Sequence, residues 1–160
     1  MKRIQLEVGD IFEVHLGNRF KRHFQFIGID GNQLNSDVIR VFETNYKVSD
    51  RPDPINIIEG PIDFFAHCFI KVGVRLELWE RIGHFDDIGG ISPQFRSSKD
   101  FGRDEIKISD RWEVWTLGQS RRFVGRLNAD LVAAEPGEVF PPSEIVYRMR
   151  FGRYEQSLQE

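Results

Sequence analysis

Hydrophobic and polar side chains alternate along the N-terminal part of the chain with the two-residue period of β-strands. In residues 11–16 every second side chain, from Phe12 to Leu16, is apolar, and Phe24 and Phe26 repeat the pattern in the following segment. The pattern predicts two strands that each turn one apolar face toward a core.

Short turn sequences separate these strands from each other and from the next one. Gly17 and Asn18 are typical of a turn, and Asp30-Gly31 predicts a two-residue hairpin, because both central positions of such a turn need positive φ. A third, more continuously apolar strand is predicted at residues 38–42. Three consecutive strands with short connections predict a meander.

The middle of the chain predicts loops on either side of a further strand. Prolines and glycines interrupt residues 49–61, and we expect the wider segment 43–63, with five acidic residues against two basic ones, to be an exposed loop. Residues 64–78 are rich in Phe, Val, Ile and Leu and predict strand structure, with Gly73 at a bulge or bend. Residues 92–103 again have the composition of a loop.

The C-terminal part predicts a second hairpin and one helix. Residues 112–117 and 122–127 have strand patterns on either side of a Gly-Gln-Ser turn. Pro142 is typical of the first turn of a helix and Gly152 of its C-cap, and apolar residues between them share one face. We expect residues 154–160 to fray.

Together these elements predict an α+β fold dominated by β-structure. It has about seven short, mostly antiparallel strands in a meander or partly open barrel, with a C-terminal helix. The 160 residues suit one domain spanning residues 1–160, and 40% hydrophobic and 29% charged residues are ordinary values for a globular protein. A chain of this length buries about two-thirds of its unfolded surface, so its core needs no disulfide or metal.

Charge and cysteine content exclude several classes of protein. The net charge of −3, from 22 basic and 25 acidic residues, argues against nucleic acid or a membrane surface as the partner. Cys68 is the only cysteine, which excludes an internal disulfide and a cysteine-rich zinc site. No apolar stretch has the length of a signal peptide or a membrane span, and we expect the protein in the cytoplasm.

Two histidines are the first candidates for metal ligands. His15 and His23 fall on the polar faces of two strands that are predicted to pair, so the two side chains could share an ion. The sequence offers no obvious third ligand, and histidines on an exposed strand face are usually solvated. We therefore predict no metal and no other cofactor.

Two further clusters have structural explanations. His84, Asp86 and Asp87 could ligate a metal or exchange protons, but they precede a Gly-Gly pair, and turn chemistry accounts for aspartates in such a loop. His67 and Cys68 are adjacent in a predicted strand and point to opposite faces, so they cannot act together as base and nucleophile. The residues therefore predict no catalytic site.

A surface that stacks single-stranded nucleic acid is an alternative. Arg121 and Arg122 lie close in sequence to Trp112 and Trp115, and arginine and aromatic side chains together can bind bases. The competing interpretation is a solvated arginine face with cation–π contacts to the tryptophans. The alternative function is thus a nucleic-acid- or small-ligand-binding β-barrel module.

Four short motifs resemble the immunity protein 26 family of bacterial polymorphic toxin systems. They are the Gly-Asp-hydrophobic-Phe run within residues 8–16, the strands at residues 24–28 and 38–42, and the Trp-x-x-Ile-Gly run at residues 79–83. The resemblance extends over residues 8–95. It implies a non-enzymatic protein that binds and neutralises a toxin in the cell that produces it.

The resemblance also implies roles for individual residues. Gly9 and Asp10 would form a structural turn that feeds the first strand, and Phe12 and Trp79 would belong to the core. We expect stoichiometric binding to a cognate toxin domain through an acidic surface, because many toxins that act on nucleic acid are basic. The residues predicted for this partner-binding surface are Asp50, Asp53, Glu59, Asp63, Asp86 and Asp87.

Overall fold

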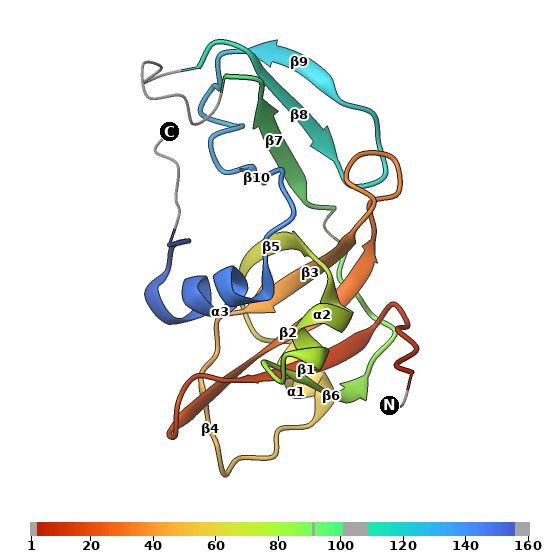
Figure 1. The fold of residues 1–160 in the computed structure, drawn as a ribbon, viewed down its shortest axis with the longest axis vertical. Coiled ribbons are helices and arrows are strands. Elements are labelled where there is room, and N and C mark those ends of the chain that lie inside the picture. Colours follow the sequence, from red (N-terminus) through yellow and green to blue (C-terminus); the bar gives the residue numbers. More distant parts are fainter. Residues whose placement is uncertain (1–2, 91, 101–108, 156–160) are drawn as a thin grey trace.

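The computed structural model describes residues 3–90, 92–100 and 109–155, which contain ten strands and three helices (Figure 1). Strands dominate and all but one of the paired strands are antiparallel, so the predicted α+β class is confirmed. In chain order the elements are β1 (Asp10–His15), β2 (Phe20–Ile29), β3 (Asp37–Phe42), β4 (Tyr46–Lys47), α1 (Pro54–Ile58), β5 (Ile62–Cys68), α2 (Ile70–Arg75), β6 (Glu80–His84), β7 (Gln94–Ser98), β8 (Trp112–Thr116), β9 (Arg122–Gly125), β10 (Glu135–Pro136) and α3 (Pro142–Phe151).

The first and larger sheet has six strands. Its main order is β5-β3-β2-β1-β6, and β4 pairs with the start of β2. The consecutive strands β1, β2 and β3 form the predicted meander, with Phe12 opposite Phe24 and Phe24 opposite Val41. Strand β6 pairs with β1 only from Asp10 to Glu13, so the last residues of β1 have no partner in β6.

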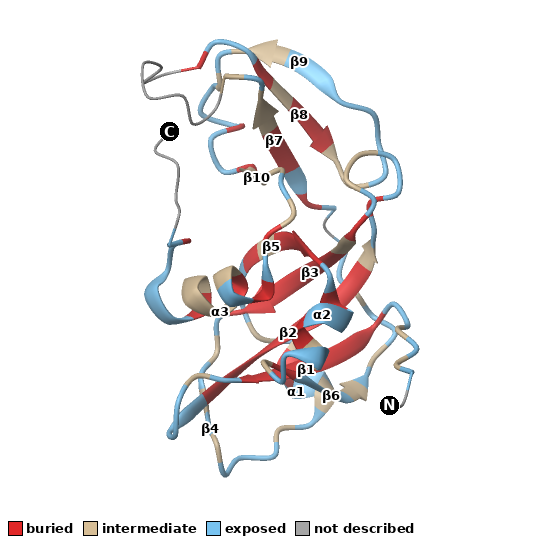
Figure 2. Ribbon diagram, in the orientation of Figure 1, coloured by how far each residue is buried: buried red, intermediate tan, exposed pale blue. Residues whose placement is uncertain are grey.

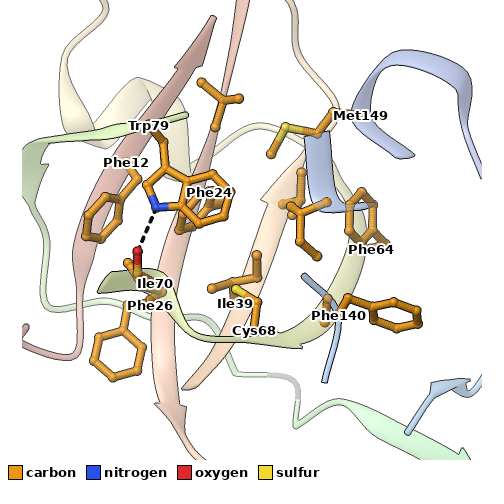
Figure 3. Close-up of a cluster of buried hydrophobic side chains, with 14 of the residues drawn as sticks. Phe12, Phe24, Phe26, Ile39, Phe64, Cys68, Ile70, Trp79, Phe140 and Met149 are labelled. Atoms are coloured by element: carbon orange, nitrogen blue, oxygen red, sulfur yellow. Dashed lines mark hydrogen bonds between the residues drawn. The ribbon is translucent and has the colours of Figure 1, made fainter. Parts of the chain in front are cut away.

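Helices α2 and α3 cover one face of this sheet and enclose the main hydrophobic core (Figure 3). The rings of Phe12 and Phe24 stack with centroids 5.1 Å apart, and Trp79 meets Phe24 edge-on at 4.9 Å. Ile145 and Met149 of α3 are buried in the same cluster, as the helical pattern predicts. The inward faces predicted for the first two strands are confirmed, and Phe12 and Trp79 are core residues.

The opposite face of the first sheet is covered as well. Helix α1 packs Ile57 against Ile11 and Phe42, while residues 85–88 and the second sheet cover other parts of this face. The middle strands are consequently buried along most of their length (Figure 2). The buried polar residues of the strands on this face include Glu13, Lys21, His23, Gln25, Arg40 and His67.

A second sheet of four strands, ordered β10-β7-β8-β9, packs at one end of the first sheet (Figure 1). Phe95 and Trp115 of this sheet contact Ile27 and Val38 of the first. The predicted C-terminal hairpin is confirmed as β8 and β9. The strands thus form two open sheets joined by a small apolar contact.

The predicted two-residue hairpin at Asp30-Gly31 is wrong. Residues 30–36 connect β2 to β3, and Asp30 is fully buried. Its carboxylate accepts hydrogen bonds from Trp115 and His67, so it belongs to the contact between the two sheets. The turn chemistry of an Asp-Gly pair does not reveal such a tertiary role.

Two segments predicted as loops contain regular structure. Segment 43–63 holds β4 and α1, because Ile57 gives the short helix an apolar anchor on the sheet. Segment 92–103 contains β7, whose Phe95 is fully buried, while residues 101–108 lie outside the described residues.

The strand predicted for residues 64–78 divides into β5 and α2. Ile70 and Gly73 lie one helical turn apart and face the core. Gly73 contacts the indole of Trp79 so closely that a Cβ at this position would overlap the ring. Gly73 therefore permits close packing, and it marks neither a bulge nor a bend.

The C-terminal helix ends as predicted, with Gly152 in a left-handed conformation at φ 76°. Tyr154, which we expected at the start of a frayed tail, is buried and stacks on Phe140 with ring centroids 3.8 Å apart. Residues 156–160 of the predicted tail lie outside the described residues.

Candidate functional site

Strand β1 places Glu13 in a cluster of polar side chains from β1 and β2. Glu13 lies opposite His23 of β2, and His15 lies opposite Lys21. Oε1 of Glu13 is 3.1 Å from Nε2 of His15. Oε2 of Glu13 is 3.0 Å from Nε2 of His23 and 3.1 Å from Nζ of Lys21. Lys21 also donates to the backbone oxygen of Asp50 at 2.6 Å, so every charged group of this cluster has a partner.

Burial and hydrogen bonding fix the charges of this cluster. Burial opposes ionisation of Glu13, but the bonds from His23, His15 and Lys21 outweigh it and hold the pKa of Glu13 below its ordinary value. Burial lowers the pKa of His23, against the opposing effect of its bond to Glu13. At neutral pH His23 is therefore neutral and donates through Nε2 to an ionised Glu13, whose charge Lys21 balances.

The prediction that both strand histidines are solvated is right for His15 and wrong for His23. His15 is exposed, whereas His23 is 1% exposed because this face of the sheet is covered, with Tyr46 edge-on to its ring at 5.4 Å. The two imidazoles share Glu13, and the ammonium group of Lys21 lies where a cation bound to this carboxylate would lie.

A groove opens beside this cluster, at the end of β1 that extends past β6. It consists of two hollows of about 560 and about 330 Å³, which share Glu13, His15 and Glu80 in their walls. The larger hollow is also lined by Val74, Glu77, Leu78 and Trp79 at the end of α2. The smaller hollow is also lined by Val48, Arg51, Pro52 and Ile82.

Three carboxylates line the larger hollow of the groove. Glu13 and Glu80 lie directly opposite each other in β1 and β6, an arrangement in which like charges repel. Glu77 follows α2 with a φ of 58°, a left-handed conformation that residues other than glycine rarely adopt. Among the described residues, Glu77 and Glu80 have no hydrogen-bond or ion-pair partner for their side chains. Their negative charges are therefore not balanced within this part of the chain.

A second polar cluster surrounds Asp10 where β1 meets the end of β6. Oδ1 of Asp10 lies 2.9 Å from Nδ1 of His84, whose Nε2 lies 2.8 Å from Asp86. Oδ2 of Asp10 accepts from the backbone nitrogen of Glu7 at 2.9 Å and from Arg81 at 3.2 Å. Burial opposes ionisation of Asp10, but these bonds keep its pKa below the ordinary value. The bonds to Asp10 and Asp86 raise the pKa of His84.

Glu7, Asp10 and His84 form the one group in the described part of the chain whose ligand atoms are close enough for a metal ion, within 4.8 Å of one another. Both oxygens of Asp10 already accept hydrogen bonds, and the guanidinium of Arg81 adds a fixed positive charge. This donor set fits an ion-pair network that ties the start of β1 to β6 better than it fits a metal.

Gly9 makes this network possible. Its φ is 108°, and a Cβ at Gly9 would overlap both the backbone oxygen of Phe85 and the ring of His84. Gly9 and Asp10 thus form the structural turn implied by the resemblance.

A third polar cluster lies between the two sheets. Nε2 of His67 is 2.8 Å from Oδ2 of Asp30, and Nε1 of Trp115 donates to the same oxygen at 2.9 Å. His67 is fully buried against Phe95, and burial lowers its pKa against the opposing effect of Asp30. Cys68 lies on the other face of β5, in the main core, where burial raises the pKa of its thiol. The predicted separation of His67 and Cys68 is confirmed.

The six acidic residues predicted for the partner-binding surface lie in two parts of the structure. Four are in the segment from β4 to β5, and two follow β6. None of them lines the groove. Those with a side-chain partner inside the chain are Asp50, Asp63, Asp86 and Asp87. Asp87 accepts from the backbone nitrogen of Gly89 at 2.9 Å, which confirms the predicted turn chemistry.

The sequence pattern conceals the groove carboxylates. Glu13 occupies a polar position of an alternating strand, which predicts exposure to solvent. Glu77 falls inside the strand predicted for residues 64–78, and Glu80 lies inside the Trp-x-x-Ile-Gly motif. The available signal is the helical spacing of Ile70 and Val74, which would place the following residues at the end of a helix.

The stacking surface of the alternative function is closed in this structure. Trp112 and Trp115 are 5% and 2% exposed. The guanidinium of Arg121 lies over the Trp115 ring, 4.5 Å from its centroid, so the predicted cation–π contact is present. Bases would reach neither indole face without opening the second sheet.

Comparison of the chain with protein-family models, with curated proteins and with solved structures returns no match. Within the described residues, none of the helices has the length and apolar character needed to cross a membrane. The resemblance to a family therefore rests on the four short motifs alone.

Proposed function

We propose that this chain is an immunity protein that neutralises a cognate bacterial toxin by stoichiometric, non-catalytic binding in the cytoplasm. The motif resemblance supports the class, and the groove lined by Glu13, Glu77 and Glu80 is the contact surface. The partner is a toxin domain, and neither a cofactor nor a membrane nor a nucleic acid takes part.

The positions of the motif residues support the proposal. The run within residues 8–16 contains β1, and the Trp-x-x-Ile-Gly run contains most of β6. These two strands pair, with Ile11 opposite Gly83, and Trp79 packs against Phe24 of another motif. Motifs that are far apart in sequence therefore build one packed unit, and this unit forms a wall of the groove.

The single observation that carries the proposal is the composition of the groove. Its larger hollow combines unpaired carboxylates with apolar side chains on a fixed sheet edge. Protein interfaces commonly combine an apolar centre with charges that select the partner and speed its approach. A basic toxin surface would complement such a groove.

Co-expression with the toxin encoded beside this chain tests the proposal. We expect the toxin alone to stop growth of a bacterial host, and the chain to restore growth and to form an equimolar complex on size exclusion. The double variant Glu77→Lys/Glu80→Lys should lose both effects, because it reverses the charge of the groove.

The matched control carries the same charge change on the surface predicted from sequence. Asp53→Lys/Glu59→Lys alters two exposed carboxylates that have no side-chain partner among the described residues and lie outside the groove. It should protect as well as the unmodified chain. Absence of both protection and a complex for the unmodified chain refutes the immunity function, whereas loss of protection only in this control moves the interface to segment 43–63.

A further inference from the structure

The groove carries negative charge that the nearby cations do not neutralise. Arg51 is the one fixed cation among the residues that line the groove, and it donates through one nitrogen to the backbone oxygens of Val48 and Asp50; His15 is bonded to Glu13. Lys21 is 1% exposed and lies against Glu13. The carboxylates of Glu77 and Glu80 thus have no ion-pair partner in the described part of the chain, and the three carboxylates of the groove outnumber the two cations Lys21 and Arg51.

The arrangement of Glu13 and Glu80 also favours binding of a cation. They face each other across β1 and β6, and Lys21 compensates only Glu13. A bound cation beside Glu80 would remove the repulsion between the two carboxylates. The groove therefore favours a positively charged ligand over a neutral one.

The apolar wall of the groove indicates the chemical character of the uncharged part of the ligand. Val74 and Leu78 are half-buried and pack against the main core, and Trp79 closes the hollow beneath them. Such a wall accepts a hydrocarbon chain of several methylene groups. Long cationic side chains place their stem on an apolar surface and their charged head in a polar one.

We infer that the groove binds an arginine side chain presented by a protein partner, with its stem along Val74 and Leu78 and its guanidinium at Glu77 and Glu80. The inference rests on the proposed function, in which that partner is the toxin. Arginine fits better than lysine because the planar guanidinium offers five donors, enough to serve two carboxylates, and is more weakly hydrated than an ammonium group.

Titration of the full chain with short blocked peptides tests the inference. The probe is acetyl-Gly-Leu-Arg-Leu-Gly-amide, and its matched controls replace arginine by citrulline, which has the same shape without charge, or by lysine. Amide chemical shifts in the ¹⁵N-labelled chain report the site and the affinity. We expect saturable shifts at Glu77, Glu80 and His15 with the arginine peptide, about tenfold weaker binding of lysine, and none of citrulline.

Protein variants locate the binding site. Glu77→Gln/Glu80→Gln removes both charges at exposed positions and should weaken binding of the arginine peptide at least about tenfold. The NMR spectrum of the free variant should otherwise match that of the unmodified chain. Asp110→Asn/Asp130→Asn, two exposed positions outside both the groove and the acidic surface predicted from the sequence, should bind like the unmodified chain. The inference is overturned if the citrulline or the lysine peptide binds as tightly as the arginine peptide. It is also overturned if the chemical-shift changes fall outside the groove, or if the arginine peptide does not bind at low salt.

The peptide titration and the co-expression test can give opposite results, so they distinguish the arginine site from the immunity function. A chain that protects against the toxin but ignores the arginine peptide would remain an immunity protein with a different contact. A chain that binds the peptide in the groove but gives no protection and no toxin complex would keep the arginine site and lose the immunity function.

Discussion

Individual polar residues of this protein are arranged in pairs whose charge states depend on each other. Asp10 is 3% exposed and His84 is partly exposed, and their hydrogen bond lowers the pKa of the carboxyl and raises that of the imidazole. Asp86 bonds to the other ring nitrogen of His84 but is itself almost fully exposed. The buried partner should therefore dominate, because water screens the exposed one.

We predict that His84 titrates above the ordinary histidine value of 6.5 and that Asp10→Asn lowers its pKa more than Asp86→Asn does. Because the folded-state pKa is raised, the stabilisation from this pair is fully present below pH 6.5 and disappears as pH rises through the raised value. Proton NMR titration of the His84 ring in the three proteins measures both effects. An unchanged pKa in Asp10→Asn would contradict the assignment.

Residue roles that depend on chain neighbours can be predicted from the sequence, and roles that depend on covering segments cannot. The turn role of Asp87 belongs to the first kind, because its partner Gly89 is two residues away. The burial of Lys21 and His23 belongs to the second kind. Alternation places His23 on the polar face of its strand, but it does not show that other segments cover that face.

Strands β1, β2, β3 and β5 follow the hydrophobic pattern, whereas helix α2 does not. Its β-branched residues Ile70, Val72 and Val74 favour a strand, and Gly73 lowers helix propensity. The helix forms because Gly73 admits the indole of Trp79, whose Nε1 donates to the backbone oxygen of Ile70 at 3.0 Å (Figure 3). A tertiary contact thus overrides local preference, and it also positions Glu77 at the groove.

We predict that Gly73→Ala destabilises the protein by about 2 kcal/mol. A methyl group would gain roughly 1 kcal/mol of helix propensity but overlap the Trp79 ring at a cost of about 3 kcal/mol. The ring cannot easily move, because Trp79 is 4% exposed and hydrogen-bonded. Urea denaturation measures the change in the free energy of unfolding.

Gly31→Ala is the control for this prediction. No heavy atom lies within 4 Å of a Cβ at Gly31, and its φ is not positive. We expect its free energy of unfolding to stay within about 0.5 kcal/mol of the unmodified chain. Equal stability of the two variants would show that the indole gives way and that α2 does not depend on this contact.

On the scale of the whole molecule, the two sheets meet through a small contact with a polar centre. In an apolar layer between the sheets, Asp30 of the β2–β3 connection accepts two hydrogen bonds. One comes from His67 of β5 and the other from Trp115 of the second sheet. The sequence predicts strands on both sides of this contact, except β7, which falls in a segment predicted as a loop, and it does not predict that the strands separate into two sheets. Neither Asp30, which has the pattern of a turn residue, nor His67, which has the pattern of a strand residue, carries a sign of its partner.

We predict that this contact makes the whole protein less stable in mild acid. Burial lowers the pKa of His67 below 6.5, so the unfolded chain binds a proton that the folded chain does not, and stability falls as pH drops below 6.5. His67 contributes a slope of up to about 1.4 kcal/mol per pH unit to the free energy of unfolding.

His67→Gln keeps a donor for Asp30 without titrating, and urea denaturation between about pH 7.5 and about pH 5.5 should show a smaller slope than in the unmodified chain. Trp115→Phe should lose about 1 kcal/mol at both pH values and keep the slope, because it removes only the second donor. If His67→Gln retained the full slope, the acid sensitivity would come from another group, of which buried His23 is the first to test.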